Sequence, residues 1–139
     1  MKLLFLIFIF STSLFANTSW IEDYDEAVNI AQEQNKRIYM LIVSEDCRWC
    51  KKFERTTLKD EKLLKRLSKQ YVLLHLSRDL DEIPSKFKTT PVPRHYFLSK
   101  SGEVIFPVVG YRDVDTFNNF LDTVNERVKK EKNDISTDR

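Results

Sequence analysis

The chain has 139 residues, of which 42% are hydrophobic and 12% aromatic. This length fits one domain, and the apolar content is enough for a packed core, which excludes an intrinsically disordered chain. With 23 Lys and Arg against 21 Asp and Glu, the formal net charge is only +2. We therefore expect no nucleic-acid partner, since such proteins carry a strong basic field. Two cysteines are too few for a disulfide-dense scaffold.

The N-terminus carries one positive charge, Lys2, followed by an unbroken apolar run that ends at Phe10. This pattern is typical of a secretory signal peptide. Small residues follow, and we expect cleavage after Ala16, with cleavage after Ser13 as the alternative. An uncleaved anchor is disfavoured because the run is shorter than the roughly 20 residues that span a bilayer.

The predicted organisation is a cleaved signal peptide over residues 1–16, one domain over residues 17–130 and a flexible polar tail over residues 131–139. No later stretch is apolar for long enough to cross a membrane. The mature protein is therefore expected to be periplasmic, without stable insertion into a membrane.

A first helix is predicted from apolar residues at helical spacing, namely Ile21, Tyr24, Ala27, Val28 and Ala31. Ser19 and Glu22 have the spacing of a capping box, which places the helix start beside them. We expect this helix to end near Asn35.

The continuous apolar run of residues 38–43 predicts a strand buried on both faces. The mostly apolar run of residues 71–76 predicts a second strand. Helical residues lie between them, including a helix around Leu63, Leu64 and Leu67 for which Asp60 is the expected N-cap. Two strands separated by helix favour a parallel crossover.

The second half of the chain begins with a polar connector up to Thr90, and residues 95–98 and 103–106 then predict an antiparallel hairpin. A final helix opens at Asp113 or Asp115. Its apolar face is formed by Val114, Phe117, Phe120, Leu121, Val124 and Val128. The element order predicts one α/β domain with a mixed sheet, and no nucleotide-binding or serine-hydrolase motif is present.

Cys47 and Cys50 form a Cys-x-x-Cys pair at the predicted junction of a buried strand and a helix. Two sulfurs at this spacing can bond reversibly. A helix N-terminus stabilises an anion, so Cys47 is predicted to be the attacking thiolate. Cys50, one turn further in, is predicted to resolve the mixed disulfide by attacking the sulfur of Cys47. This redox centre needs no cofactor.

Charged side chains surround the pair, and they are candidate modulators of its reactivity: Arg48, Lys51, Lys52, Glu45 and Asp46. The basic residues favour a thiolate and the acidic ones oppose it, so the sequence does not give the sign of the net effect. Trp49 is a candidate for packing against a bound substrate, with plain coverage of the domain surface as the alternative.

Two other interpretations of the cysteine pair remain. The pair could be half of a zinc site, but four ligands are normally required, and His75 and His95, the only histidines, lie in predicted strands without metal-finger spacing. We expect no metal. The pair could also be an inert structural disulfide, although a bridge closing so short a loop constrains the unfolded chain little.

The chain resembles the thioredoxin superfamily, in particular its exported thioredoxin-like members. The resemblance extends from about Trp20 to Val128 and is carried by Trp20 with Tyr24-x-x-Ala27 and Lys36, by Asp46-Cys47-Arg48-Trp49-Cys50-Lys51-Lys52-Phe53, and by Val92-Pro93. It implies a thioredoxin-like fold, with a central mixed β-sheet flanked by helices. It also implies that Val92 and Pro93 form a substrate-contacting cis-proline loop, a role for which Pro91 competes.

Two features differ from thioredoxin itself, which has Gly-Pro between its cysteines and a buried acid six residues before the first. Here Arg48 and Trp49 lie between the cysteines, and Leu41 occupies the position of the acid. The proton acceptor for Cys50 is therefore unassigned. Glu45 is a candidate, and a solvated loop carboxylate is the alternative interpretation of that residue.

The resemblance and the pair together predict a periplasmic thiol–disulfide oxidoreductase that exchanges disulfides with protein substrates through Cys47 and Cys50. By analogy with similar exported proteins we expect a reductase, which a membrane-bound redox partner recharges. The alternative is a non-catalytic module with the same fold that binds peptides and carries a structural disulfide.

Overall fold

The computed structural model describes residues 19–88 and 91–137, so the predicted signal peptide lies outside the described residues. The elements in chain order are α1 (Tyr24–Gln34), β1 (Arg37–Val43), α2 (Arg48–Arg55), the 3₁₀-helix η1 (Thr57–Lys59), α3 (Glu61–Gln70), β2 (Tyr71–Ser77), the 3₁₀-helix η2 (Ser85–Phe87), β3 (Arg94–Leu98), β4 (Val104–Val109) and α4 (Val114–Thr137).

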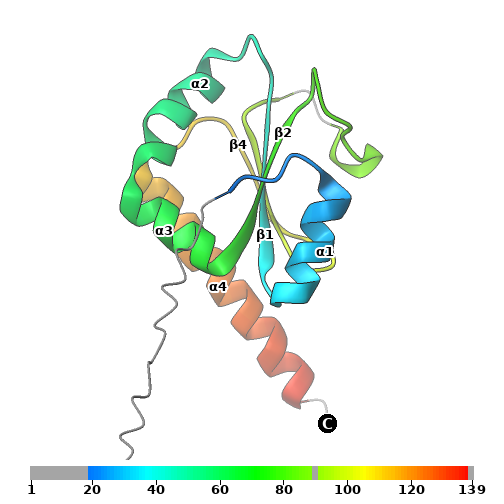
Figure 1. The fold of residues 1–139 in the computed structure, drawn as a ribbon. Helices are drawn as coiled ribbons and strands as arrows, with labels where there is room; N and C mark the ends of the chain where they lie inside the picture. Colours follow the sequence, from blue (N-terminus) through cyan, green and yellow to red (C-terminus); the bar gives the residue numbers. More distant parts are fainter. Residues whose placement is uncertain (1–18, 89–90, 138–139) are drawn as a thin grey trace, which may run out of the picture.

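Four strands form one mixed sheet in the order β2-β1-β3-β4. β1 pairs with β2 in parallel and with β3 antiparallel, and β3 and β4 form the hairpin. Helix α1 covers one face of the sheet, while α2, α3 and α4 cover the other (Figure 1). The expected α/β fold with a parallel crossover and a C-terminal hairpin is confirmed.

β1 is the central strand, and all of its residues from Ile38 to Val43 are buried. Its side chains alternate between two cores, as the pleat of a strand requires. On the face of α2, α3 and α4 the strand contributes Tyr39, Leu41 and Val43. On the face of α1 it contributes Ile38, Met40 and Ile42. A continuous apolar sequence is thus needed because both faces of this strand are covered.

The start of α1 differs from the prediction. Its N-cap is Asp23, whose Oδ1 accepts a hydrogen bond from the Glu26 N–H at 2.7 Å, so the expected capping box of Ser19 and Glu22 is wrong. Ile21 is not helical but forms an isolated parallel bridge with Leu74. An apolar residue that fits the helical period also fits an extended segment at a sheet edge, which is why the pattern misled. The end near Asn35 is confirmed.

The caps of the later helices agree better with the sequence. Asp60 accepts a hydrogen bond from the Leu63 N–H at 2.8 Å and begins α3. Asp113, one of the two alternatives, accepts one from the Thr116 N–H at 2.9 Å and begins α4. Both aspartates satisfy backbone donors that the first helical turn leaves without partners.

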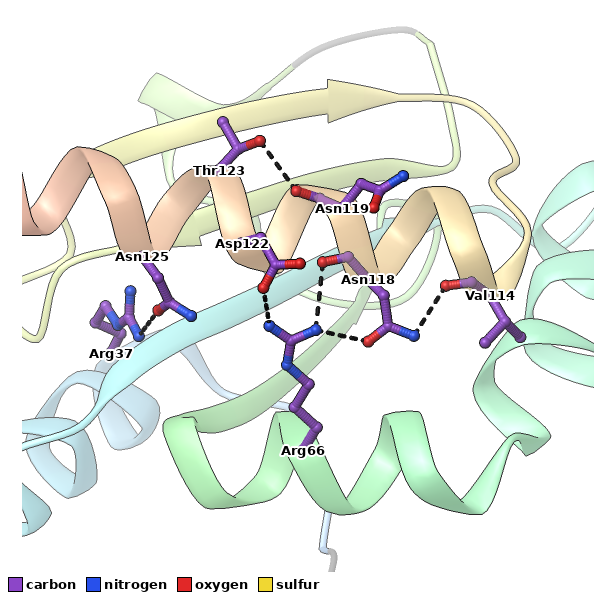
Figure 2. A network of polar contacts seen from close by, with 8 residues as sticks. All are labelled: Arg37, Arg66, Val114, Asn118, Asn119, Asp122, Thr123 and Asn125. Atoms are coloured by element: carbon purple, nitrogen blue, oxygen red, sulfur yellow. Dashed lines mark hydrogen bonds and ion pairs between the residues drawn. The ribbon is translucent and has the colours of Figure 1, made fainter.

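Helix α4 is tied to the rest of the domain by two arginines (Figure 2). Arg66 of α3 forms an ion pair with Asp122 and donates a hydrogen bond to Asn118 Oδ1 at 2.8 Å. Arg37 at the start of β1 donates to Asn125 Oδ1 at 2.6 Å. These contacts fix the helix over the sheet in addition to its buried apolar face.

Residues 131–137, which the sequence analysis assigned to a flexible tail, are helical in the structure, because α4 continues to Thr137. Its last turns run past the end of the strands (Figure 1). This segment is polar and charged, and only its first two residues, Glu131 and Lys132, are strong helix formers. A helix already anchored along its first turns can extend without a buried face.

A buried polar chain crosses the sheet on the face of α2. The Tyr39 hydroxyl lies 2.8 Å from His95 Nδ1, and His95 Nε2 lies 3.0 Å from the Gly110 carbonyl oxygen. A carbonyl can only accept, so Nε2 carries the proton and Nδ1 accepts from Tyr39. This arrangement needs a neutral imidazole, and burial lowers the pKa of His95 from 6.5 to about 4.

This pKa predicts an acid-sensitive fold. Between pH 6.5 and pH 4 the unfolded chain holds a proton on His95 that the native protein does not, so stability falls as the pH falls through that window. At pH 5 the loss relative to neutral pH should be about 2 kcal/mol, from about 1.4 kcal/mol per pH unit. Urea unfolding at pH 7 and pH 5 measures it.

The variant His95→Gln is the control, because every other titrating group is shared with the wild type. We expect the variant to be less stable at neutral pH but to lose about 2 kcal/mol less on acidification. Equal losses in both proteins would show that His95 does not take up a proton on unfolding.

Candidate active site

The cysteine pair lies where β1 leads into α2. Cys47 is the N-cap of α2, with an extended backbone, and its Sγ accepts a hydrogen bond from the Cys50 N–H at 3.0 Å. The two cysteines form a disulfide, and their Cα atoms are 5.2 Å apart. Backbone N–H groups at a helix N-terminus stabilise negative charge on a sulfur in this position.

The two sulfurs have different surroundings. Cys47 is half-buried, whereas Cys50 is only 1% exposed and belongs to the core between the sheet and the helices α2, α3 and α4. An incoming thiol or disulfide can therefore reach Cys47 more easily than Cys50. This difference comes from the helix, which turns Cys50 inward along with Phe53.

The basic residues of α2 are exposed around the pair. Arg48 and Lys52 lie over the ring of Trp49, at 5.7 Å and 5.1 Å from its centre, and Lys51 is exposed beside them. Glu45 is exposed on the preceding loop, where its backbone N–H donates to Asp79 Oδ2 at 2.7 Å. The cations thus lie on the helix and the acid on the loop.

Trp49 is 48% exposed and packs against Tyr111, a residue to which no sequence pattern pointed. The two ring centres are 5.9 Å apart, and Lys52 Nζ lies 4.6 Å from the Tyr111 ring. The Tyr111 hydroxyl is 3.4 Å from Thr56 Oγ1 at the end of α2. Only the fold brings this tyrosine to Trp49, because it follows β4, far along the chain.

The Val92–Pro93 peptide bond is cis, and Pro93 is buried while Val92 is half-buried. The Pro93 carbonyl accepts a hydrogen bond from the Gly110 N–H at 2.8 Å, which ties this loop to the segment of Tyr111. The bond before the competing Pro91 involves a residue outside the described part of the chain. Strand β3 begins directly after Pro93, and its first residue, Arg94, is paired with Ile42 near the C-terminal end of β1. Pro93 therefore lies at the same end of the sheet as the loop that carries Cys47.

Leu41 is fully buried and lies between two histidines across the sheet. It is paired with His75 of β2 and with His95 of β3. His75 Nε2 lies 2.7 Å from Glu54 Oε1 of α2. Both histidines were expected in strands, but nothing in the linear sequence places them beside Leu41.

The residues that the structure describes contain no group of three or more His, Cys, Asp and Glu side chains that could hold a metal ion. The zinc interpretation of the cysteine pair therefore lacks its further ligands within that part of the chain. The same residues contain no helix with the length and hydropathy of a membrane span.

Solved structures of similar fold include several redox proteins. A thioredoxin from Thermus thermophilus has 23% identity and a TM-score of 0.66, with 77% of this chain and 87% of that chain covered. A putative disulphide isomerase from Bacteroides thetaiotaomicron has 21% identity and a TM-score of 0.68, with 78% and 93% covered. The C-terminal domain of DsbD from Neisseria meningitidis, in its oxidised form, has 13% identity and a TM-score of 0.63, with 76% and 98% covered.

At these identities the structural likeness establishes the fold. No curated protein matches the sequence. A family model described as a thioredoxin-like domain matches residues 24–125, which is most of the chain and includes the disulfide between α2 and the preceding loop. The chain therefore belongs to the thioredoxin-like domain family, and its Cys47–Cys50 pair makes it a thiol–disulfide oxidoreductase whose redox centre is the disulfide itself.

Proposed function

We propose that the protein reduces disulfides of other proteins outside the cytoplasm. The observation that carries this proposal is the asymmetry of the pair, with Cys47 half-buried at a helix N-terminus and Cys50 buried behind it. One sulfur is placed to meet a substrate, and the other is placed to meet only its neighbour.

In the reducing direction, the Cys47 thiolate attacks one sulfur of a substrate disulfide. A bond forms between Cys47 Sγ and that sulfur, the substrate S–S bond breaks, and the other substrate sulfur leaves as a thiolate. The Cys50 thiol then loses its proton and attacks Cys47 Sγ, which releases the second substrate thiol. The substrate gains two electrons and the protein returns to the disulfide form.

In this proposal the substrate contacts a rim formed by Trp49, Tyr111, Val92 and Pro93. The Trp49 ring offers an exposed apolar face beside Cys47. The hydrogen bond from the Gly110 N–H to the Pro93 carbonyl links the loop of Val92 and Pro93 to the segment of Tyr111. Arg48 and Lys51 lie on this rim as exposed cations, and with Glu45 they tune the reactivity of the Cys47 thiolate.

The N-terminal sequence supports the location. A single lysine, an apolar run and small residues up to Ala16 are the pattern of a secretory signal, which would deliver the domain to the periplasm. A reductase there needs a source of electrons, and a membrane-bound redox partner is the source we propose. The similarity in fold to the C-terminal domain of DsbD is compatible with an extracytoplasmic redox role.

The second candidate is a peptide-binding module whose disulfide only braces the rim. The rim of Trp49, Tyr111 and Pro93 would serve such a module equally well. The two functions differ in whether the disulfide opens during the working cycle.

Removing Cys47 separates these functions. With insulin as substrate and dithiothreitol as electron donor, we expect Cys47→Ser to lower the rate of disulfide reduction to the uncatalysed background, because the remaining Cys50 is only 1% exposed and is shielded from a substrate disulfide. Turbidity of the precipitating insulin chains measures the rate. Activity retained in Cys47→Ser would contradict the assignment of the attacking sulfur.

The matched variant is Cys50→Ser, which keeps Cys47 but cannot resolve the intermediate. We expect it to accumulate a covalent mixed disulfide with insulin, seen as a shift on a non-reducing gel. A wild-type protein that is inactive in the same assay would favour the peptide-binding module.

Export predicts a specific mature N-terminus. When the full chain is expressed in a Gram-negative bacterium, we expect the periplasmic fraction to contain a protein that begins at Asn17, because the signal peptidase cleaves after a small residue such as Ala16. Intact mass spectrometry of the fractions measures this. A full-length protein confined to the cytoplasm or the membrane would contradict the location.

A further inference from the structure

Resolution of the mixed disulfide requires that Cys50 lose a proton inside the protein. The thiolate is the nucleophile in disulfide exchange, and Cys50 is 1% exposed, so bulk water cannot reach it directly. Leu41 of β1 belongs to the same core as Cys50, and it has no group that could accept a proton. A proton acceptor must therefore come from another element that packs around Cys50.

Tyr39 and His95 of the sheet also face this core, and neither is suited to the task. Tyr39 of β1 is protonated, because burial raises its pKa well above 10.0. His95 of β3 uses both ring nitrogens, one with Tyr39 and one with Gly110, and its pKa is lowered to about 4 by burial. A proton placed on His95 would break one of these buried hydrogen bonds.

Glu54 and His75 satisfy the geometric requirement. Glu54 follows Cys50 by four residues on α2, a spacing that puts both side chains on the same side of the helix. Its charge acts on buried Tyr39 and raises the pKa of that residue further, so the carboxylate lies toward the core side of α2. His75 of β2 is paired across the sheet with Leu41 and meets Glu54 at 2.7 Å.

The pair also has a way to pass the proton on. The side chains of His75 and Glu54 are 27% and 36% exposed, whereas Cys50 is buried. Trp20 covers the same region, with its ring centre 6.1 Å from that of His75 and 6.0 Å from that of Tyr39. The pair thus lies between the shielded sulfur and the solvent.

We propose that Glu54, held in place by His75, accepts the proton of Cys50 when the mixed disulfide is resolved. This rests on the proposed function. The Cys50 S–H bond breaks, and the proton passes to Glu54 Oε2, directly or through one water molecule, while Oε1 keeps its hydrogen bond to His75. The Cys50 thiolate then bonds to Cys47 Sγ and the substrate thiolate leaves. The proton returns to solvent from the exposed side of the pair.

Glu45, the candidate from the sequence, is placed differently. It precedes Cys47 on the loop, and its side chain is exposed on the outside of the domain. Cys50 faces the interior. The two glutamates therefore give a direct comparison, with the same side chain at two places around one cysteine pair.

Stopped-flow reaction of the reduced protein with dithiobis(nitrobenzoate) separates the two steps. Attack by Cys47 releases a first thionitrobenzoate and leaves a mixed disulfide, and attack by Cys50 on that disulfide releases the second. At pH 7 we expect Glu54→Gln to slow the second release by at least about tenfold, which is less than the roughly 10²–10⁴-fold typical of general acid–base catalysis, and to leave the first unchanged. Glutamine keeps an oxygen for His75 but is a poor proton acceptor.

Three further variants make the result specific. Glu54→Ala should regain the second phase as formate is added, because a small carboxylate can occupy the vacated space. Glu54→Asp should be intermediate in rate. Glu33 is an exposed residue of α1, on the opposite face of the sheet, and Glu33→Gln should match the wild type in both phases. Thermal unfolding of each oxidised protein identifies any variant that fails to fold. If Glu54→Gln does not fold, recovery of the second phase of Glu54→Ala by formate tests the proposal in its place.

The proposal is overturned if the second phase of Glu54→Gln stays within twofold of the wild type, or if both phases slow equally. It is also overturned if Glu45→Gln, and not Glu54→Gln, slows the second phase. A wild-type protein that releases only one thionitrobenzoate would instead contradict the proposed function, since Cys50 would then not act at all.

Discussion

The burial of β1 on both faces and both edges places the active site. Strands β2 and β3 flank β1, and helices cover both of its faces. This packing fixes the position of the C-terminal end of β1 relative to the rest of the domain. The loop after Val43 passes directly into α2, and Cys47 becomes the N-cap of that helix. A sulfur at the edge of a fully packed core can be rigidly held and still be reached from outside, which a surface loop alone would not provide.

The same packing gives the two cysteines unequal surroundings, and that inequality is the basis of the chemistry. Cys47 lies among exposed cations and beside Trp49, while Cys50 lies among apolar side chains. The interior nevertheless contains polar groups in fixed arrangements: Tyr39 with His95 and Gly110, and His75 with Glu54. The hydrogen bonds of Tyr39, His95 and Gly110 are buried and support the fold. The pair of His75 and Glu54 is partly exposed to solvent and can exchange a proton with it.

Much of the fold could be predicted from the sequence, because long apolar runs and Cys-x-x-Cys are strong local signals. The start of α1 could not, since Ile21 fits both a helix and a bridge to Leu74. The helical extension past Lys130 was missed because it has no apolar periodicity. In the site, the cysteines were predictable from spacing, but Tyr111 and the pair of Glu54 and His75 were not. They meet their partners only through sheet register and the return of the chain after β4.

The most direct test of the central claim is a redox titration of the mature domain in graded glutathione buffers. Thiols are trapped by alkylation and counted by mass spectrometry. We expect Cys47 and Cys50 to change together and reversibly, with a midpoint near the reducing end of the range for this fold, about −270 mV. A midpoint near about −120 mV would contradict the reducing direction. A disulfide that stays closed at every ratio would contradict the assignment of this pair as a redox centre.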